Sequence, residues 1–436
     1  MIHPSLPRSI QLTAALIVTL ASSSHAAEKL DQIKGKIFNV QPNQKCFELL
    51  TETVIDPKTD EGKSRHTIYW NDKTEFTKVV RHQNFKEIKG RVLVEFHGLN
   101  EKWADAIQGG KPFRHRSLNI LPSSNKKPLG MSKDRSKLVA WFTADPNSPR
   151  NRDGVVEFDG KSIKASLPGP SGAVDVHSPA TAKDLSSGFW ETTIHGQRSD
   201  GKFLASNMEI YPKTDPRDND DPTLPRVLVV GDSISMNYHQ ATKEQLKGIA
   251  NYYRVVGNAG PSDRGVTCME LWLGDYKQKG LHWDLIQFNH GLHDLKQLYN
   301  EETKTYGKYQ IDIKAYQANL EKEIAILRKT GATLMWCSTT PVPNSSIGRW
   351  DNVTMGRRKD EDLAFNKAAL EVISKHPDIL INDLNQSVRD AAKSSEHFAN
   401  WNKGTDVHFW HAPQQKIVGT AVANAIKDAL KKGSSK

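Results

Sequence analysis

The sequence contains very little cysteine. Its three cysteines, Cys46, Cys268 and Cys337, are too few and too scattered among 436 residues for a disulfide scaffold, and none belongs to a CxxC pair of the kind that binds zinc. We expect all three to be buried thiols. If one disulfide forms, Cys268 with Cys337 is the favoured pair, because both lie in the carboxyl-terminal half.

Long apolar runs and a strong charge of one sign are missing as well. Hydrophobic residues make up 37% of the chain, charged residues make up 25%, and the mean hydropathy is −0.60. These values exclude a multispanning membrane protein and a wholly disordered chain. The 60 Lys and Arg against 50 Asp and Glu give a net charge of +10, which suits an acidic polymer, an anionic surface or simply a solvated exterior. The length favours two or three domains over one.

Signatures of metal and nucleotide enzymes are absent too. There is no HExxH, and the Gly-Lys-Ser sequences at 62–64 and 160–162 lack the earlier glycine of a phosphate-binding loop. Ser233 is followed by Ile-Ser instead of the x-Gly of the α/β-hydrolase nucleophile elbow. We therefore predict neither a metal nor a cofactor.

The amino terminus has the features of a cleaved secretory signal over residues 1–26. A positive charge precedes the mostly apolar residues 10–21, and Ser24-His25-Ala26 places small residues where signal peptidase cuts. The apolar stretch is too short to span a bilayer comfortably, and no later stretch is apolar enough. No cysteine follows the cleavage site, so a lipoprotein anchor is not expected. We predict a secreted or periplasmic protein with no membrane span.

Two Pro-, Lys- and Asp-rich stretches, 121–135 and 211–225, divide the rest of the chain into three parts. Residues 27–120 and 136–210 contain short β-type runs bounded by Gly, Asn and Asp. We expect two small β-rich domains of barrel or sandwich type there.

The two β-rich segments echo each other near their ends. His97-Gly98 is followed by Gly-Lys-Pro-Phe and then Ser-Leu-Asn-Ile-Leu-Pro, while His195-Gly196 is followed by Gly-Lys-Phe and then Ser-Asn-Met-Glu-Ile-Tyr-Pro. A duplicated barrel and two merely similar hairpins are both compatible with this match.

Residues 226–436 alternate short apolar runs with amphipathic stretches. The expected strands are 227–230, 254–256, 284–288, 333–337 and 379–381, and the expected helices are 236–250, 313–329, 363–374 and 414–430. This alternation predicts a parallel sheet covered by helices on both faces. Such sheets bind ligands at the carboxyl ends of their strands.

Three polar clusters lie at such places. GDSIS at 231–235 follows the first strand and puts Ser233 at the start of a helix, where backbone N–H groups favour a developing anion. A second cluster at 289–294 follows the third strand, and a third at 405–409 precedes the last helix. Serine becomes a nucleophile when an imidazole accepts its proton, and that imidazole needs an acceptor that fixes its tautomer. The chain order Ser, Asp, His supplies these parts.

With the motifs GDSIS, NAGPSDRG at 258–265, HGLHD at 290–294 and DVHF at 406–409, residues 226–436 resemble the SGNH (GDSL-type) hydrolases, especially a branch of secreted bacterial members. The resemblance covers this half of the chain only. It implies a flavodoxin-like three-layer α/β/α domain that hydrolyses esters through an acyl-enzyme.

The resemblance also implies an oxyanion hole. Ser233 is the nucleophile, and its own N–H is the first donor. The second donor is a backbone glycine after strand two, for which Gly265 is preferred and Gly260 is the alternative. The third is the asparagine of the family's GxND, whose place His293 takes here, with Asn289 as the fallback. A neutral imidazole can donate, but unlike an amide it can also be protonated, so activity would depend differently on pH.

His408 matches the family's general base. The family places its aspartate three residues before this histidine, but Thr405 stands there, and Asp406, two residues before, is the nearest carboxylate. Either Asp406 orients His408 or a backbone carbonyl does so in a Ser–His pair. His411 is the rival base.

The aromatic and basic residues bear on the substrate. Five tryptophans are candidates for stacking on sugars, although core packing is their ordinary role: Trp70, Trp103, Trp141, Trp190 and Trp350. The loop 341–360 after the fourth strand carries Arg349, Arg357 and Arg358, which could meet an acidic glycan.

We predict a secreted serine esterase that removes acyl groups, acetyl foremost, from a small molecule or a carbohydrate. An anionic glycan is a candidate partner, and nucleic acid is not. One alternative is a periplasmic polysaccharide O-acyltransferase that uses the same site. The other is a non-catalytic glycan-binding protein whose GxHD and DxH motifs have decayed.

Overall fold

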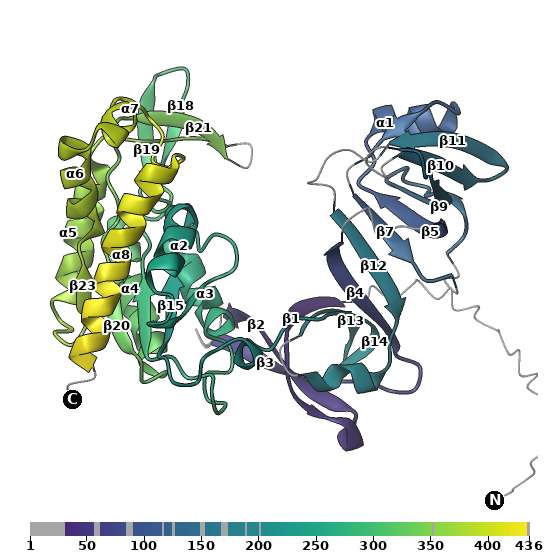
Figure 1. The fold of residues 1–436 in the computed structure, drawn as a ribbon, viewed down its shortest axis with the longest axis horizontal. Helices are drawn as coiled ribbons and strands as arrows, with labels where there is room; N and C mark the ends of the chain where they lie inside the picture. The colour runs from purple at the N-terminus through teal and green to yellow at the C-terminus, as the bar shows by residue number, and fades with distance from the viewer. Residues whose placement is uncertain are drawn as a thin grey trace, which may run out of the picture.

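The structure, a computed structural model, describes residues 31–55, 62–83, 90–115, 117–123, 127–148, 153–166, 173–187, 190–199, 202–350 and 353–433. The predicted signal peptide lies outside these residues. Figure 1 shows an α/β domain on the left, a first barrel at the bottom and a second barrel at the upper right. Among the helices of the described residues, none is both long and apolar enough to cross a membrane.

The first barrel is a closed ring of five strands. They are β1 (Asp31–Gln41), β2 (Cys46–Ile55), β3 (Gly62–Tyr69), β13 (Glu191–Ser199) and β14 (Lys202–Tyr211). The ring runs β1-β2-β3-β14-β13 and back to β1, antiparallel except between β3 and β14. Its interior holds fully buried apolar side chains such as Ile37, Phe47, Ile68 and Ile194. The ring closes between β3 and β14 at the pairs Ile68–Phe203 and Tyr69–Leu204.

The second barrel is inserted into the first. Its strands are β5 (Arg91–His97), β6 (Phe113–Arg114), β7 (Ser117–Leu121), β9 (Lys137–Ala144), β10 (Asp153–Phe158) and β11 (Lys161–Ser166), with β8 (Gly130–Met131) beside β9 and α1 (Glu101–Gln108) between β5 and β6. The ring runs β9-β10-β11-β6/β7-β5 and back to β9. Alternation on β10 buries Val156 and Phe158 in a separate core.

Two long strands join the barrels. β4 (Glu75–Gln83) pairs with β14 of the first barrel, and β12 (Ala173–Pro179) pairs with β7 of the second, while β4 and β12 pair with each other. One continuous sheet therefore passes from one barrel to the other.

This topology corrects the predicted boundaries of the β-rich half. Strands from both predicted segments, 27–120 and 136–210, share the core of the first barrel. The stretch 121–135 does not separate two domains, because β5 pairs both with β7, which ends at Leu121, and with β9 after it, and because β8 lies within the stretch. Its polar composition indicated an exposed loop but could not tell which strands pair across it.

The sequence echo falls on matching strands of the two rings. His97 ends β5 and His195 lies on β13, and the echoing segments that follow form β6–β7 and β14. β5 is antiparallel to β7, and β13 is antiparallel to β14. In the second ring β6 is parallel to β11, and in the first ring β14 is parallel to β3. The two barrels thus have the same strand order with a different starting strand.

The α/β domain contains a parallel sheet of five strands. They are β15 (Arg226–Val230), β16 (Asn251–Arg254), β17 (Leu285–Phe288), β20 (Thr333–Cys337) and β23 (Leu380–Asn382), in the order β16-β15-β17-β20-β23. This is the flavodoxin-like order. All five residues of β15 are buried, as expected for a central strand covered on both faces.

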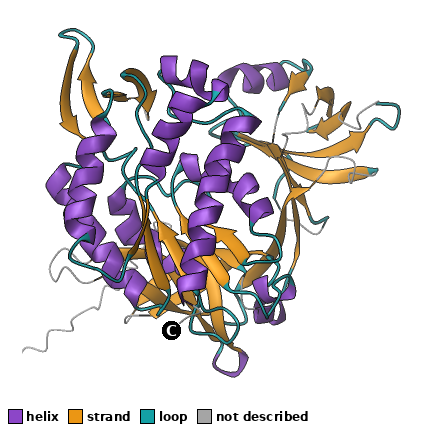
Figure 2. Cartoon of the chain, turned by 60° about the vertical axis from the view of Figure 1, so that its left-hand side comes forward, coloured by secondary structure: helices purple, strands orange, loops and turns teal. Residues whose placement is uncertain are grey.

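Helices cover both faces of this sheet (Figure 2). They are α2 (Ser233–Gln245), α3 (Ser262–Leu273), α4 (Ile313–Arg328), α5 (Glu361–Ile373), α6 (Leu384–Ser394), α7 (Ala399–Lys403) and α8 (Ala412–Gly433). Helices α2 and α8 pack together, as do α3 and α4. The expected helices correspond to α2, α4, α5 and α8, whereas α3, α6 and α7 are additional.

A small antiparallel sheet also belongs to this domain. It consists of β18 (Gln297–Asn300), β19 (Thr305–Tyr309), β21 (Ser346–Trp350) and β22 (Val353–Arg357), in the order β19-β18-β22-β21. The segment 341–360, expected to be a loop, contains the β21–β22 hairpin of this sheet. The three cysteines are free and buried, so Cys268 and Cys337 form no disulfide.

A buried ion pair stabilises the start of the α/β sheet. Arg226 Nε donates to Asp220 Oδ2 at 2.7 Å, and the two side chains are only 6% and 10% exposed. The Arg226 guanidinium lies 4.3 Å from the ring centroid of Trp283, and its Nη1 donates to the Leu281 carbonyl at 2.7 Å.

Replacing Arg226 by methionine should destabilise the protein, because Asp220 would keep a buried charge without its partner. We expect the free energy of unfolding to fall by about 3 kcal/mol in urea titration followed by tryptophan fluorescence. The double variant Arg226→Met/Asp220→Asn should recover part of that loss. A loss of less than about 1 kcal/mol in the single variant would contradict this view of the pair.

Candidate active site

Ser233 stands at the carboxyl end of β15 and is the first residue of α2. The preceding Asp232 is buried and caps this helix, since its carboxylate accepts the Ile234 N–H at 2.9 Å. The cap fixes the turn that presents Ser233 at the helix terminus. The unpaired N–H groups and the dipole of α2 then favour negative charge beside the serine.

His408 is in place to accept the serine proton. Its Nε2 lies 2.8 Å from Ser233 Oγ, and its Nδ1 lies 2.6 Å from Asp406 Oδ1. The Nδ1 contact places the proton on Nδ1 and leaves Nε2 free to accept. Ser233, His408 and Asp406, predicted from the motifs, are therefore brought together as a triad. The rival His411 takes no part in these contacts.

The short spacing between Asp406 and His408 is accommodated by a tight local turn. The backbone N–H of His408 donates to Asp406 Oδ1 at 3.0 Å, so one oxygen receives both the backbone and the ring of the same residue. Phe409 N–H donates to Asn237 Oδ1 on α2 at 3.0 Å and ties this loop to the helix that carries the serine. Asp406 therefore reaches His408 Nδ1 although it lies two residues before the histidine instead of three.

Trp410 completes the support of the acid. Its indole N–H donates to Asp406 Oδ2 at 2.7 Å, and its ring centroid lies 5.0 Å from that of His408. Burial opposes ionisation of Asp406, but hydrogen bonds from Trp410 and His408 outweigh it and lower its pKa. The carboxylate is therefore present at neutral pH. Sequence reasoning missed Trp410, although its place two residues after His408 was a usable signal.

His293 is a neutral hydrogen-bond donor. Burial is the main reason that its pKa falls to about 3, and the nearby charges of Lys296 and Arg357 lower it further. Lys296 Nζ lies 3.1 Å from His293 Nδ1. An ammonium only donates, so Nδ1 accepts and the ring proton sits on Nε2. The expected sensitivity of this donor to pH does not arise near neutrality, because the ring stays uncharged.

The loop that carries His293 is fixed to the start of α3. Asp294 Oδ1 accepts the backbone N–H of Ser262 at 2.9 Å and also its hydroxyl. Burial raises the pKa of Asp294 to about 6 against these two hydrogen bonds. In the first turn of α3 the N–H groups of Arg264 and Gly265 donate to the Pro261 carbonyl. Among the described residues, the Asp263 N–H of this turn has no acceptor, which makes it the open backbone donor at this end of the helix.

The two predicted glycine donors are therefore contradicted. The N–H of Gly265 is used inside α3, and a side chain there would overlap buried Glu323 and His290, so this glycine serves packing. The N–H of Gly260 donates to Asn258 Oδ1 at 2.9 Å, and its φ of 70° explains the glycine. The motif spacing did not reveal that α3 begins before residue 265.

The fallback donor Asn289 is also engaged elsewhere. Its amide donates to the Cys337 carbonyl at 2.7 Å and links β17 to the end of β20. This bond holds two neighbouring strand ends together. His293 is thus the better side-chain donor.

The arginines of segment 341–360 do not form an open basic patch. Arg357 is buried and donates to the Leu292 carbonyl at 2.8 Å, and Arg358 pairs with Glu361 at 3.0 Å. Arg349 on β21 is exposed. In the described part of the chain, no three His, Cys, Asp or Glu side chains gather as metal ligands.

Comparisons with known proteins give similarities to solved structures. No protein-family model matches the chain, and no curated protein matches it. Among solved structures, a GDSL-like lipase from Bacteroides thetaiotaomicron is 15% identical, with 47% of this chain and 88% of that chain covered and a TM-score of 0.32. An acetyl xylan esterase, AlAXEase, is 14% identical, with 46% and 99% covered and a TM-score of 0.34.

A third solved structure is the carboxyl-terminal catalytic domain of peptidoglycan O-acetyltransferase A from Streptococcus pneumoniae. It is 15% identical, with 49% of this chain and 96% of that chain covered and a TM-score of 0.32. Each of these matches covers about half of this chain.

Replacing His293 tests its role as an oxyanion donor. His293→Ala should lower kcat on p-nitrophenyl acetate by about 10²-fold with little change in KM, because a donor to the transition state is lost. His293→Asn supplies an amide donor and should recover part of the rate. Wild-type kcat in the alanine variant would remove His293 from the oxyanion hole.

Proposed function

We propose that this protein is an exported serine esterase of the SGNH type that removes acyl groups, acetyl foremost, from a carbohydrate. The observation that carries the proposal is the continuous contact from Asp406 through His408 to Ser233 Oγ at the amino terminus of α2. These contacts bring a nucleophile, a general base and an acid together, which supports a serine acyl-transfer site.

The geometry supports a two-step reaction. Ser233 Oγ attacks the ester carbonyl while His408 Nε2 takes the hydroxyl proton, and Asp406 stabilises the imidazolium that forms. The oxyanion receives hydrogen bonds from the Ser233 N–H and from neutral His293. His408 then gives the proton to the departing alcohol. In the second step it activates a water that releases the acid from the acyl-enzyme.

Solvent access favours hydrolysis over transfer to a second sugar. The side chains of Asp406 and His408 are 55% and 25% exposed, so the histidine is partly open to water. A transferase must keep water from its acyl-enzyme, which calls for a closed site. The intact triad likewise speaks against a decayed, non-catalytic site.

The serine variant tests the esterase. Ser233→Ala should lower the rate of p-nitrophenyl acetate hydrolysis by at least about 10³-fold, because the nucleophile is removed. Ser374→Ala, on an exposed serine at the end of α5, serves as the control and should keep the wild-type rate. Equal rates for wild type and Ser233→Ala would refute the hydrolase.

Trp410 supports a carbohydrate as the alcohol. It is 63% exposed, although one indole edge is held by Asp406, so much of its ring is open to solvent beside the triad. The C–H face of a pyranose packs well on such a ring. A sugar stacked on Trp410 would lie next to His408 and thus near the ester bond.

Two variants of Trp410 separate its contacts. Trp410→Phe loses the N–H to Asp406 but keeps a ring, whereas Trp410→Ala loses both. On p-nitrophenyl acetate the two variants should lose a similar factor in kcat. On an acetylated methyl xyloside, Trp410→Ala should also raise KM by about tenfold, and Trp410→Phe should not. Equal KM values in the two variants on the xyloside would contradict the sugar platform.

A further inference from the structure

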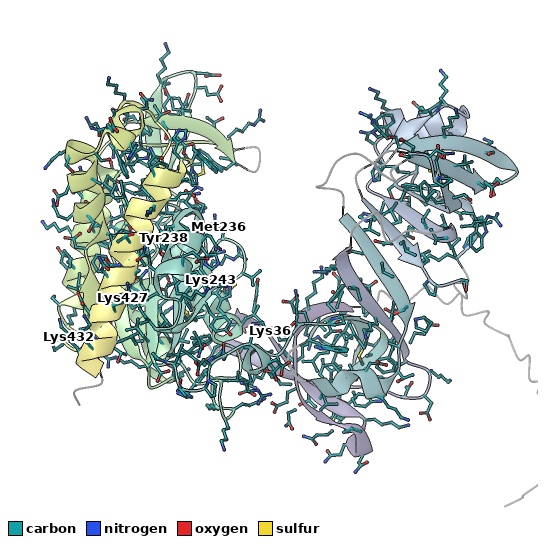
Figure 3. All side chains as sticks on the ribbon, viewed as in Figure 1. Lys36, Met236, Tyr238, Lys243, Lys427 and Lys432 are labelled. Carbon is teal, nitrogen blue, oxygen red and sulfur yellow. The ribbon has the colours of Figure 1, made fainter. Side chains whose placement is uncertain are left out.

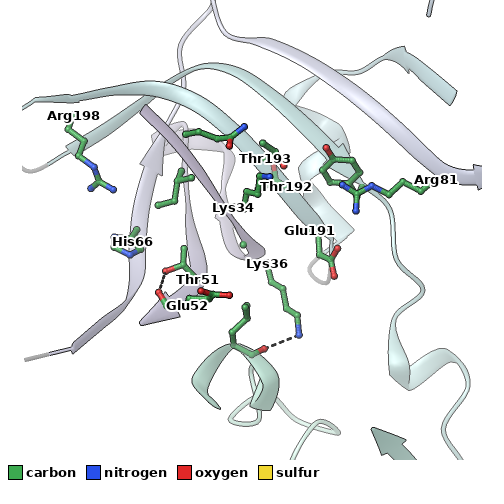
Figure 4. Close-up of a pocket in the computed structure, with 15 residues that line it drawn as sticks. Lys34, Lys36, Thr51, Glu52, His66, Arg81, Glu191, Thr192, Thr193 and Arg198 are labelled. Atoms are coloured by element: carbon green, nitrogen blue, oxygen red, sulfur yellow. Dashed lines mark hydrogen bonds between the residues drawn. The ribbon is translucent and has the colours of Figure 1, made fainter. Parts of the chain in front are cut away.

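A cavity of about 580 Å³ lies where the first barrel meets the α/β domain (Figure 4). Barrel strands β1, β2, β3, β4, β13 and β14 line it, together with Leu271 of α3. A second cavity of about 430 Å³ adjoins it, because Lys36, Glu52, Glu191 and Leu271 line both. We call these two cavities the junction groove. Lys36 marks its position between the barrel and the α/β domain in Figure 3.

The junction groove has an excess of positive charge. Four cationic side chains and two carboxylates line its first cavity: Lys34, Lys36, Arg81, Arg198, Glu52 and Glu191. The mechanism proposed above uses none of them. Part of the net charge of +10 that the whole sequence carries is therefore concentrated in this cavity.

Two cations of the groove, Lys34 and Arg198, are only lightly engaged by the protein. The Lys34 side chain is exposed and has no hydrogen bond or ion pair with any described residue. Arg198 faces Asp31 at 3.6 Å, with both side chains more than half exposed, a pair that contributes little. Lys36 Nζ donates to the Leu271 carbonyl at 3.0 Å near the carboxyl end of α3. Lys34 and Arg198 are therefore available to an anion.

The remaining lining selects among anionic ligands. Glu52 and Glu191 would repel a dense polyanion but can accept hydrogen bonds from hydroxyl groups. Single-stranded nucleic acids bind by stacking bases on open aromatic rings, whereas in the first cavity the Tyr211 ring is covered by the Arg81 guanidinium at 3.7 Å. Spaced carboxylates together with many hydroxyls are the chemistry of an acidic oligosaccharide.

The groove is connected to the active site through α3. Its cavities touch Leu271 in the last turn of α3, while Ser262 at the other end is bonded to the loop of His293. Twelve residues of helix span about 18 Å. An extended oligosaccharide can cover that distance.

We propose that the junction groove is a binding site for a carboxylate-bearing oligosaccharide, in which Lys34 and Arg198 bind the carboxylates and Glu52 and Glu191 bind hydroxyl groups. This site goes beyond the esterase, since it binds the glycan chain apart from any ester. In this proposal the first barrel holds the oligosaccharide that carries the ester.

Calorimetric titration of the full chain with a galacturonic acid hexamer tests the site without any turnover. Maltohexaose is the neutral ligand of equal length, and a thymidine hexanucleotide is the nucleic acid ligand. Lys34→Glu/Arg198→Glu is the test variant. Lys314→Glu/Lys322→Glu, two exposed lysines of α4 outside both cavities, makes the same change in net charge as a control. Thermal unfolding midpoints check that both variants fold.

The wild type should bind the acidic hexamer at low salt, more weakly as salt rises, and at least about tenfold more tightly than maltohexaose. The test variant should lose about tenfold in affinity, and the control variant should match the wild type. The proposal is overturned if the test variant binds like the wild type, if maltohexaose binds equally well, or if the acidic hexamer does not bind. Tighter binding of the oligonucleotide would overturn it as well.

Discussion

The hydrogen bond between Ser233 Oγ and His408 Nε2 joins residues 175 positions apart, and the α/β domain is arranged so that it can form. One partner is held by Asp232, which caps α2 from the end of a central strand. The other lies on a loop that is fixed by the bond between Phe409 and Asn237. Because Asn237 is on the same helix as the serine, the two ends of the bond share one rigid support. A shift of α2 moves nucleophile and base together.

A second layer of buried polar groups holds the loops around this bond. Asp294 binds the start of α3, and His290 Nδ1 contacts the Gly260 carbonyl at 2.9 Å. Behind them lies Glu323, whose pKa is raised well above its usual value by burial. Gly265 leaves the space that Glu323 and His290 fill. The glycine of NAGPSDRG at 265 is thus required by the core beneath the site.

The sequence identified those residues whose role follows from their neighbours along the chain. Apolar runs placed four of the five parallel strands, whereas β16 lies mostly before the expected 254–256. Polar residues directly after two of the strands gave Ser233 and His293, and the DVHF motif before the last helix gave His408. The spacing of residues within the motif 258–265 was less reliable. It favoured the Gly265 N–H as an oxyanion donor because it does not show that α3 begins at Ser262 and uses this N–H. Trp410 was overlooked although it lies two residues after His408, because its hydrogen bond to Asp406 is seen only in the structure. The inserted barrel could not be predicted, because pairing between strands far apart in the chain leaves no local pattern.

The central claim is that Ser233 is made nucleophilic by His408. Treatment with a fluorophosphonate followed by intact and peptide mass spectrometry tests it directly, because the reagent labels an activated serine without any knowledge of the substrate. The account predicts one adduct per chain, on the peptide that contains Ser233, and its loss in His408→Ala. An adduct on another residue, no adduct, or labelling that persists in His408→Ala would contradict it.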